Sequence, residues 1–295
     1  MKNFIKKITF FIIGNNFISF LLYQFIKYRN SKIYVINYHK TSIKNLHTFN
    51  NQIKFYKKNF ELISENDLLK YINGEKLSGK KPKLLISFDD GHISNYDVTS
   101  KILNENNIKG LFFIPAKYID RIEENSLESE CEVSTNKYNI PCFLNEEKNH
   151  NRKRVSMNWN NINELINYGH SIGCHGYLHK RLSKNLTHEE LEEEINKGRK
   201  IIETNIKKPI KSFAWIGGET WSYSNQAAKL ISDAKFNLSF MTCAKPFDKA
   251  QNQLQLHRFN IEDFFDLNQV RTVLFGFYEL IYFLKRLKVN KITKI

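Results

Sequence analysis

Residues 84–91 read LLISFDDG. An apolar run of strand length ends abruptly in two adjacent carboxylates, Asp89 and Asp90, and a glycine. Neighbouring anions repel each other, and a buried position would also strip them of water. We therefore expect the strand to end at the mouth of a site rather than inside a core.

Segments typical of strands alternate with helical segments on both sides of this stretch. This alternation predicts a mostly parallel α/β sheet or barrel, in which polar residues just past the carboxyl ends of the strands form the active site. The predicted strands are 33–39, 84–88, 108–114, 171–174, 212–216, 238–242 and 253–259. The predicted helices are 50–59, 65–72, 98–106, 160–168 and a long one that opens at the capping box of Thr187 and runs to about residue 205.

The composition fits one large domain with terminal additions. The chain has 295 residues, 41% of them hydrophobic, and contains no internal repeat or low-complexity linker. We predict an amphipathic, membrane-associating helix over 1–30, the main domain over 31–262 with a polar insertion at about 121–156, and a C-terminal amphipathic helix with a basic tail over 263–295. The net charge of +15 indicates either a solvated lysine-rich surface or attraction to an anionic surface. No nucleic-acid-binding motif accompanies it.

The N-terminal segment carries no charge from residue 8 to residue 26. On a helical wheel its polar residues fall on one side and its aromatic and aliphatic residues on the other, which favours a helix lying in a membrane interface. Packing against the domain and a membrane-spanning anchor are the alternatives. The four cysteines, Cys131, Cys142, Cys174 and Cys243, form no C-x-x-C pair and favour a reducing compartment. We expect a cytoplasmic protein, peripheral at the inner membrane face; the alternative is a membrane-anchored protein that faces outside.

Residues that could take part in catalysis or bind a metal follow four of the predicted strands. They are Tyr38-His39, Asp89-Asp90, the segment from His175 to His179, and the turn from Trp215 to Gly218. His175 and His179 are four residues apart, so a helical turn would place both imidazoles on one face. Together with one carboxylate they would form a two-histidine, one-carboxylate metal site with open positions for water and substrate.

Three segments in order carry a family resemblance: SFDDG (87–91), NWNNINELINYGHSIGCHGYLHKRLS (158–183), and LTHEELEEEINKGRKIIE (186–203) followed by SFAWIGG (212–218). The chain resembles the polysaccharide deacetylase family, also called carbohydrate esterase family 4 or the NodB-homology domain. VINYHKTS (35–42) is similar to the N-terminal Tyr-His of its circularly permuted branch. The resemblance covers roughly residues 33–262 and implies an irregular (β/α) barrel.

The resemblance implies a division of roles at the metal. Asp90, His175 and His179 would bind a divalent ion, Zn²⁺ in the first place and Co²⁺, Mn²⁺ or Ni²⁺ as alternatives. Asp89 would be the general base toward the attacking water, and Arg258 is a candidate for the cation that keeps Asp89 ionised.

The resemblance also implies groups that act on the substrate. A backbone N–H around Trp215, Ile216 and Gly217 would hold the oxyanion, and a histidine would protonate the leaving amine. We assign that acid to His39, with His257 in LQLHRF as the alternative.

Two positions depart from the family pattern. Gly176 stands where a serine or threonine usually follows the first metal histidine, so a supporting hydroxyl is missing. The third motif, Trp215-Ile-Gly-Gly218, lacks the usual proline. Cys174 is expected to be a small buried residue, with a fourth metal ligand as the alternative, and Trp159 and Trp221 are expected to be core or wall residues rather than sugar platforms.

The resulting prediction is a metal-dependent hydrolase of carbon–nitrogen, non-peptide bonds. It would remove N-acetyl groups from an N-acetylated sugar in a polysaccharide or glycan precursor of the bacterial cell surface. The alternatives are a catalytically silent relative that binds carbohydrate or serves as a scaffold, and a deacylase of a non-sugar amide.

Overall fold

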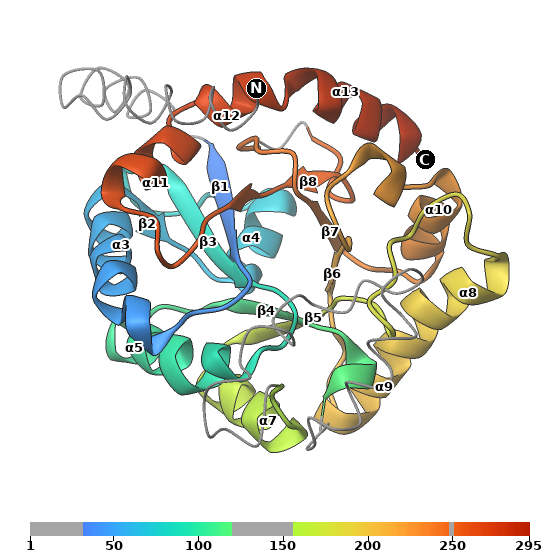
Figure 1. Ribbon diagram of the computed structural model, residues 1–295, viewed down its shortest axis with the longest axis horizontal. Coiled ribbons are helices and arrows are strands. Elements are labelled where there is room, and N and C mark those ends of the chain that lie inside the picture. Colours follow the sequence, from blue (N-terminus) through green and yellow to red (C-terminus); the bar gives the residue numbers. More distant parts are fainter. Residues whose placement is uncertain (1–31, 120–155, 248–250) are drawn as a thin grey trace.

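The computed structural model describes residues 32–119, 156–247 and 251–295. Figure 1 shows strands enclosed by a ring of helices, with α12 and α13 along one rim. The predicted helix over 1–30, nearly all of the insertion predicted at 121–156, and the residues Cys131 and Cys142 lie outside the described part of the chain.

The strands form a nearly closed parallel barrel, which confirms the predicted fold. They run in the order β8-β7-β6-β5-β4-β3-β1-β9, and β2 pairs with β3 beside this path. Their bounds are β1 Ile33–Tyr38, β2 Glu61–Leu62, β3 Lys83–Phe88, β4 Leu111–Ile114, β5 Ser171–Cys174, β6 Ser212–Ala214, β7 Leu238–Met241, β8 Leu256–His257 and β9 Phe259–Asn260. Since β8 pairs with β7 and β9 pairs with β1, the single segment 256–260 closes the ring.

The closing segment differs from its prediction. The sequence predicts one strand over 253–259, whereas two short strands are separated at Arg258. The Arg258 N–H donates to Met241 in β7, and its carbonyl accepts from Ala244 just beyond β7. Arg258 therefore stays bonded to the β7 side while the chain crosses to β1.

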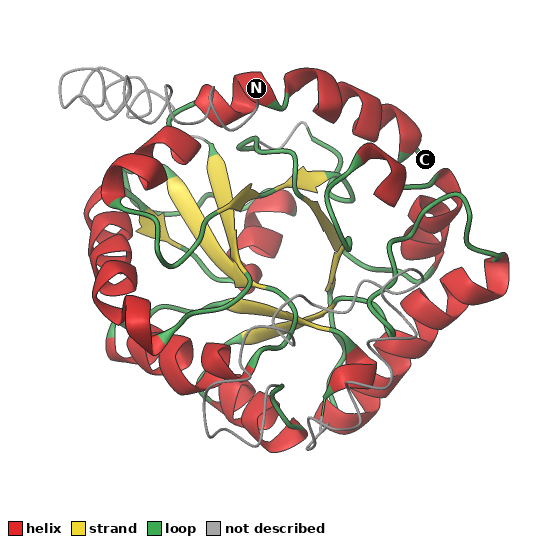
Figure 2. Ribbon diagram, viewed as in Figure 1, coloured by secondary structure: helices red, strands yellow, loops and turns green. Residues whose placement is uncertain are grey.

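Most of the helices form a ring outside the barrel (Figure 2), whereas α4 lies within that ring in this view and its Leu68 belongs to the interior apolar cluster. The α-helices are α3 Leu46–Asn59, α4 Glu65–Ile72, α5 Lys101–Glu105, α7 Trp159–Asn167, α8 His188–Glu192, α9 Gly198–Ile206, α10 Asn225–Asp233, α11 Leu267–Leu274, α12 Phe277–Ile281 and α13 Phe283–Ile292. Segments Asn95–Ser100 and Glu193–Lys197 are π-helical, and the 3₁₀ turns are Ile43–Asn45, Ala116–Tyr118 and Thr220–Ser222. The predicted capping box at Thr187 is present. Among the described residues, no helix has the length and apolar character needed to cross a membrane.

The period of two along each strand sorts side chains between the barrel interior and the helix layer. Val35, Leu85 and Phe113 belong to the apolar cluster inside the barrel, whereas Tyr34, Leu84 and Phe112 pack in the cluster under the helices. Polar residues continue the interior series toward the carboxyl ends of two neighbouring strands: Asn37 in β1, and Ser87 and then Asp89 at the end of β3. The same alternation puts Cys174 and Trp215 in the outer cluster.

Candidate active site

The ends of β1 and β3 bring His39 and Asp89 to neighbouring positions. The two strands are parallel, with Tyr38 opposite Phe88, and the Asp89 N–H donates to the Tyr38 carbonyl over 2.8 Å. The Asn95 side-chain amide donates to the carbonyls of both His39 and Asp89, at 3.2 and 3.3 Å. The residues that follow the two strands are therefore fixed relative to each other.

The backbone turns sharply immediately after Asp89. Asp90 and Gly91 have φ values of 71° and 66°, in the left-handed region that glycine tolerates and other residues rarely adopt. A side chain on Gly91 would also approach Ile119. This turn explains the glycine of the SFDDG stretch, and it gives consecutive aspartates different surroundings.

Asp90, His175 and His179 converge as the sequence predicts. The Nε2 atoms of His175 and His179 lie 3.3 and 3.1 Å from Asp90 Oδ1, and all three side chains are buried. His175 Nδ1 donates to the Ala214 carbonyl at 2.9 Å, which leaves Nε2 with a lone pair directed toward Asp90. One potential ligand atom from each residue lies within 4.8 Å of the other two.

These residues fit a divalent metal ion. Asp90 Oδ1 is buried, accepts no hydrogen bond, and faces two imidazole nitrogens. Burial alone would raise the pKa of Asp90, but the neighbouring imidazoles of His175 and His179 hold it well below its ordinary value. An ionised carboxylate beside two imidazole nitrogens is a donor set that suits Zn²⁺. Cys174 packs under the helices, so the alternative of a fourth ligand is wrong.

The helical turn predicted for HGYLH is absent. Residues 175–179 form a loop, with φ values of 79° at Gly176 and 59° at His179. The imidazoles nevertheless meet, with ring centroids 4.8 Å apart. The loop backbone, rather than helical spacing, brings the two histidines together.

Glu194 supports this loop, and the sequence analysis missed it. Its buried carboxylate accepts hydrogen bonds from the N–H groups of Tyr177, Leu178 and Lys180, at 2.9–3.2 Å. A Cβ on Gly176 would lie 2.4 Å from Glu194 Oε2. Burial raises the pKa of Glu194 to about 7, against these hydrogen bonds. Glu194 thus supports the backbone next to Gly176, where the family pattern has a serine or threonine. The glycine at this position was the feature of the sequence that could have indicated the close contact with Glu194.

Arg258 and Asp89 form a buried bidentate ion pair. Nη1 and Nη2 of Arg258 donate to the two carboxylate oxygens of Asp89, each over 2.7 Å. Arg258 has no solvent exposure, and Nη1 also donates to Asn37 and Ser87. Burial alone would raise the pKa of Asp89, but the Arg258 charge holds it below the ordinary value. The contact predicted from the sequence is present.

His39, and not His257, lies near the carboxylates. A positive charge on His39 lowers the pKa values of both Asp89 and Asp90. His257 lies on the other face of its strand, where Nε2 is 2.8 Å from Asn290 of α13, and burial lowers its pKa to about 4. The His257 side chain therefore faces the helix layer, which favours His39 over His257 as the acid.

The turn after β6 offers fewer oxyanion donors than expected. The Trp215 N–H donates to the Phe240 carbonyl within the sheet, so Trp215 is not a donor to substrate. Ile216 and Gly217 follow it, and within the described residues neither backbone N–H has a partner. The prediction of Trp215, Ile216 and Gly217 therefore narrows to the last two.

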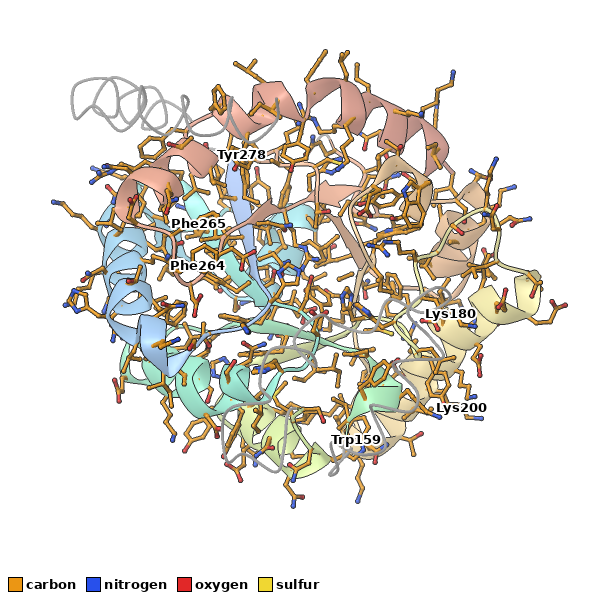
Figure 3. All side chains as sticks on the ribbon, viewed as in Figure 1. Trp159, Lys180, Lys200, Phe264, Phe265 and Tyr278 are labelled. Atoms are coloured by element: carbon orange, nitrogen blue, oxygen red, sulfur yellow. The ribbon has the colours of Figure 1, made fainter. Side chains whose placement is uncertain are left out.

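Phe264 is an exposed aromatic residue in the segment that follows β9. This segment lies between β9 and α11, and the Phe264 ring packs edge-on against Phe265. Figure 3 labels both rings on that segment and shows Trp159 at α7, elsewhere around the barrel.

Replacing Arg258 with methionine tests the ion pair. The change leaves Asp89 buried without its counter-charge, so the free energy of unfolding near pH 7 should fall by about 3–5 kcal/mol. Because the Asp89 pKa is depressed in the folded protein, the stabilisation exists above about pH 4 and is lost as pH falls through the folded pKa. Urea unfolding should therefore show the difference between wild type and Arg258→Met shrinking at acid pH.

The double variant Asp89→Leu/Arg258→Met is the control for lost volume. It removes both charges and should be more stable at neutral pH than Arg258→Met alone. If both variants lose the same free energy of unfolding at every pH, the loss does not come from an unpaired Asp89 charge, and the ion-pair assignment is contradicted.

Comparison with known proteins agrees with this geometry. The family model described as Polysaccharide deacetylase matches residues 76–238, more than half of the chain. The match includes Asp89, Asp90, His175, His179 and the turn after β6, whereas His39 and Arg258 lie outside it. No curated protein matches the chain.

Several solved structures share the fold. IcaB from Ammonifex degensii is 17% identical with a TM-score of 0.63, covering 84% of this chain and 97% of its own. The Streptococcus pyogenes deacetylase PplD, solved in complex with acetate, is 14% identical with a TM-score of 0.62. The match covers 82% of this chain and 98% of PplD. A de-N-acetylase from Aggregatibacter actinomycetemcomitans is 17% identical with a TM-score of 0.61. The match covers 82% of this chain and 100% of that enzyme's chain.

Proposed function

Since the chain belongs to the polysaccharide deacetylase family, we propose that it is a metal-dependent hydrolase that removes N-acetyl groups from an N-acetylated sugar in a polysaccharide or glycan precursor. The observation that carries this proposal is the pair of carboxylates in one site: Asp90 faces two imidazoles, and Asp89 is held by Arg258. Hydrolysis of an amide needs both an electrophilic centre and a separate base.

Asp90, His175 and His179 would hold the ion. When bound, a divalent metal such as Zn²⁺ supplies Lewis-acid activation of the attacking water and of the amide carbonyl. His175 keeps its orientation through the Ala214 carbonyl, and Glu194 supports the backbone before His179. These contacts fix the ligand atoms before any ion arrives.

Asp89 would accept the proton of the attacking water. Arg258 keeps this carboxylate ionised and orients it, while Asp89 Oδ2 lies 3.9 Å from His175 Nε2. The N–H groups of Ile216 and Gly217 would donate to the oxygen that becomes negative as water adds to the carbonyl. His39, beside Asp89, would donate a proton to the departing sugar amine, so that acetate and a free amine result.

Two other functions are less well supported. A catalytically silent carbohydrate-binding relative has no need for an ionised base beside an intact metal-binding group, and this chain keeps both. A deacylase of a non-sugar amide would use the same residues, so the substrate panel below separates it from the proposed function.

Acetate release from N-acetyl-chito-oligosaccharides, with a non-sugar acetamide as the comparison, tests the proposed reaction. The zinc-loaded protein should release acetate from the sugars. Asp89→Asn should keep its zinc, measured by elemental analysis, and lose about 10²–10⁴-fold in kcat because only the base is lost. Asp90→Asn should lose both zinc and activity. Full activity in zinc-bound Asp89→Asn would show that another group is the base.

The two candidate acids are distinguished by a pair of variants. His39→Ala should lower kcat about 10²–10⁴-fold while zinc content stays unchanged, because protonation of the leaving amine fails. His257→Ala should affect stability and leave kcat near wild type, because that ring contacts Asn290 of α13. The assignment is reversed if His39→Ala turns over normally and folded His257→Ala does not.

We also propose that the protein docks peripherally on an anionic membrane through α12 and α13. Leu280 and Leu284 are each 76% exposed, and Ile281, Phe283 and Leu287 are also exposed. The exposed basic residue Lys291 lies four residues after Leu287 in α13, so the two side chains share one face of the helix. Adjacent apolar and basic side chains match the hydrocarbon boundary and the charged headgroups of an anionic bilayer surface.

Co-sedimentation with phosphatidylcholine vesicles, with and without phosphatidylglycerol, tests this docking face. The full chain should bind the anionic vesicles better, and Leu280→Ser/Leu284→Ser should bind them more than about tenfold more weakly, because each leucine loses about 1.5–3 kcal/mol of burial. Ile43→Ser, at another exposed apolar residue, is the matched control. Loss of binding on deleting residues 1–30, with the double leucine variant unaffected, would contradict the role of α12 and α13.

A further inference from the structure

A pocket lies between α13 and the segment that joins β6 to α10. Its volume is about 480 Å³, within the range of small-molecule sites, and its lining includes Lys184, Trp221, Gln226 and Lys288. Trp221 is 58% exposed and lines the pocket, so it is a wall residue and not a core residue, the two roles expected from the sequence. A large aromatic side chain that is exposed to solvent within a pocket is typical of a ligand-binding surface.

The charge lining this pocket is unbalanced. It contains two lysines and no carboxylate. Both lysines are exposed, and no residue in the described part of the chain forms an ion pair or hydrogen bond with either ammonium group. Two lysine side chains in a pocket that has no acidic lining residue favour an anionic ligand.

Arg181 connects the pocket to the metal-binding loop. It lies two residues after His179, its guanidinium stacks 4.9 Å from the Trp221 ring centroid, and its Nε donates to Glu219 at 3.1 Å. Glu219 also accepts from Gly218 and Ser222, in the turn that follows the oxyanion candidates. Arg181 and Glu219 thus link the pocket to the two loops of the active site, residues 175–179 and the turn after β6.

We infer that this pocket is a subsite for an anionic saccharide unit that neighbours the N-acetyl sugar undergoing hydrolysis. The Trp221 ring would stack on the apolar face of the sugar ring, Gln226 would offer a donor and an acceptor to hydroxyl groups, and Lys184 and Lys288 would pair with a carboxylate or phosphate. The inference rests on the proposed function and makes the preferred substrate an acidic glycan.

Calorimetric titration of the zinc-loaded full chain carrying Asp89→Asn measures binding without turnover. The probes are chitotetraose, which is neutral, the hyaluronan tetrasaccharide, which carries carboxylates, and N-acetylglucosamine 1-phosphate, which carries a phosphate. The hyaluronan tetrasaccharide should bind about tenfold tighter than chitotetraose at low salt. Tighter binding of the sugar phosphate than of N-acetylglucosamine itself would identify phosphate as a second accepted anion.

Variants of the pocket separate stacking from charge. Lys184→Gln/Lys288→Gln should weaken hyaluronan binding about tenfold and leave chitotetraose within about twofold, whereas Trp221→Ala should weaken both by about tenfold. Lys229→Gln, an exposed lysine of α10 outside the pocket, is the matched control for charge. Equal binding of the neutral and acidic probes, or a double lysine variant no different from Lys229→Gln, would overturn the subsite.

The subsite and the proposed function fail in different ways. If acetate is released from chitotetraose but the acidic probes gain nothing from the two lysines, the subsite is wrong and the deacetylase assignment stands. If discrimination between the probes depends on the lysines but no N-acetyl sugar is hydrolysed, the pocket stands and the proposed reaction is wrong.

Discussion

The buried ion pair between Asp89 and Arg258 is the constraint on which the site depends. Asp89 ends β3, and Arg258 lies where the chain passes from β8 to β9 and closes the barrel. Removing one partner of such a pair leaves an uncompensated charge in a desolvated environment, which is strongly unfavourable. The contact therefore couples closure of the barrel to the position and ionisation of the proposed base. Asn37 and Ser87 extend the same network across β1 and β3.

Backbone geometry separates the two adjacent aspartates. Asp89 follows the alternation of β3 and enters the barrel, where a fixed guanidinium neutralises it. Asp90 adopts a left-handed conformation, and its carboxylate faces His175 and His179 instead. Strained backbone of this kind persists only where surrounding contacts hold it, and it concentrates at functional sites. Here it allows consecutive carboxylates to occupy two electrostatic environments, one suited to a base and one to a metal ligand.

Sequence patterns predicted the features that follow from strand periodicity. The parallel barrel and the meeting of Asp90 with the two histidines follow once strand ends share one edge, whereas the contact of Arg258 with Asp89 was predicted from the family resemblance. The conformation of residues 175–179 was not predictable from spacing, because it depends on hydrogen bonds from Glu194, fifteen residues beyond His179. The Trp215 N–H was misassigned because pairing with β7 extends one residue past β6, and the sequence does not show where a ladder ends.

The most direct test of the division between the two aspartates is the crystal structure of the zinc-loaded protein, with the ion located by anomalous diffraction. We predict one ion about 2.0–2.2 Å from an Asp90 oxygen and from Nε2 of His175 and His179. Asp89 should lie outside the coordination sphere, with both of its bonds to Arg258 intact. An ion coordinated by Asp89, with the Arg258 contact broken, would show that the two aspartates do not divide the roles of base and metal ligand in this way.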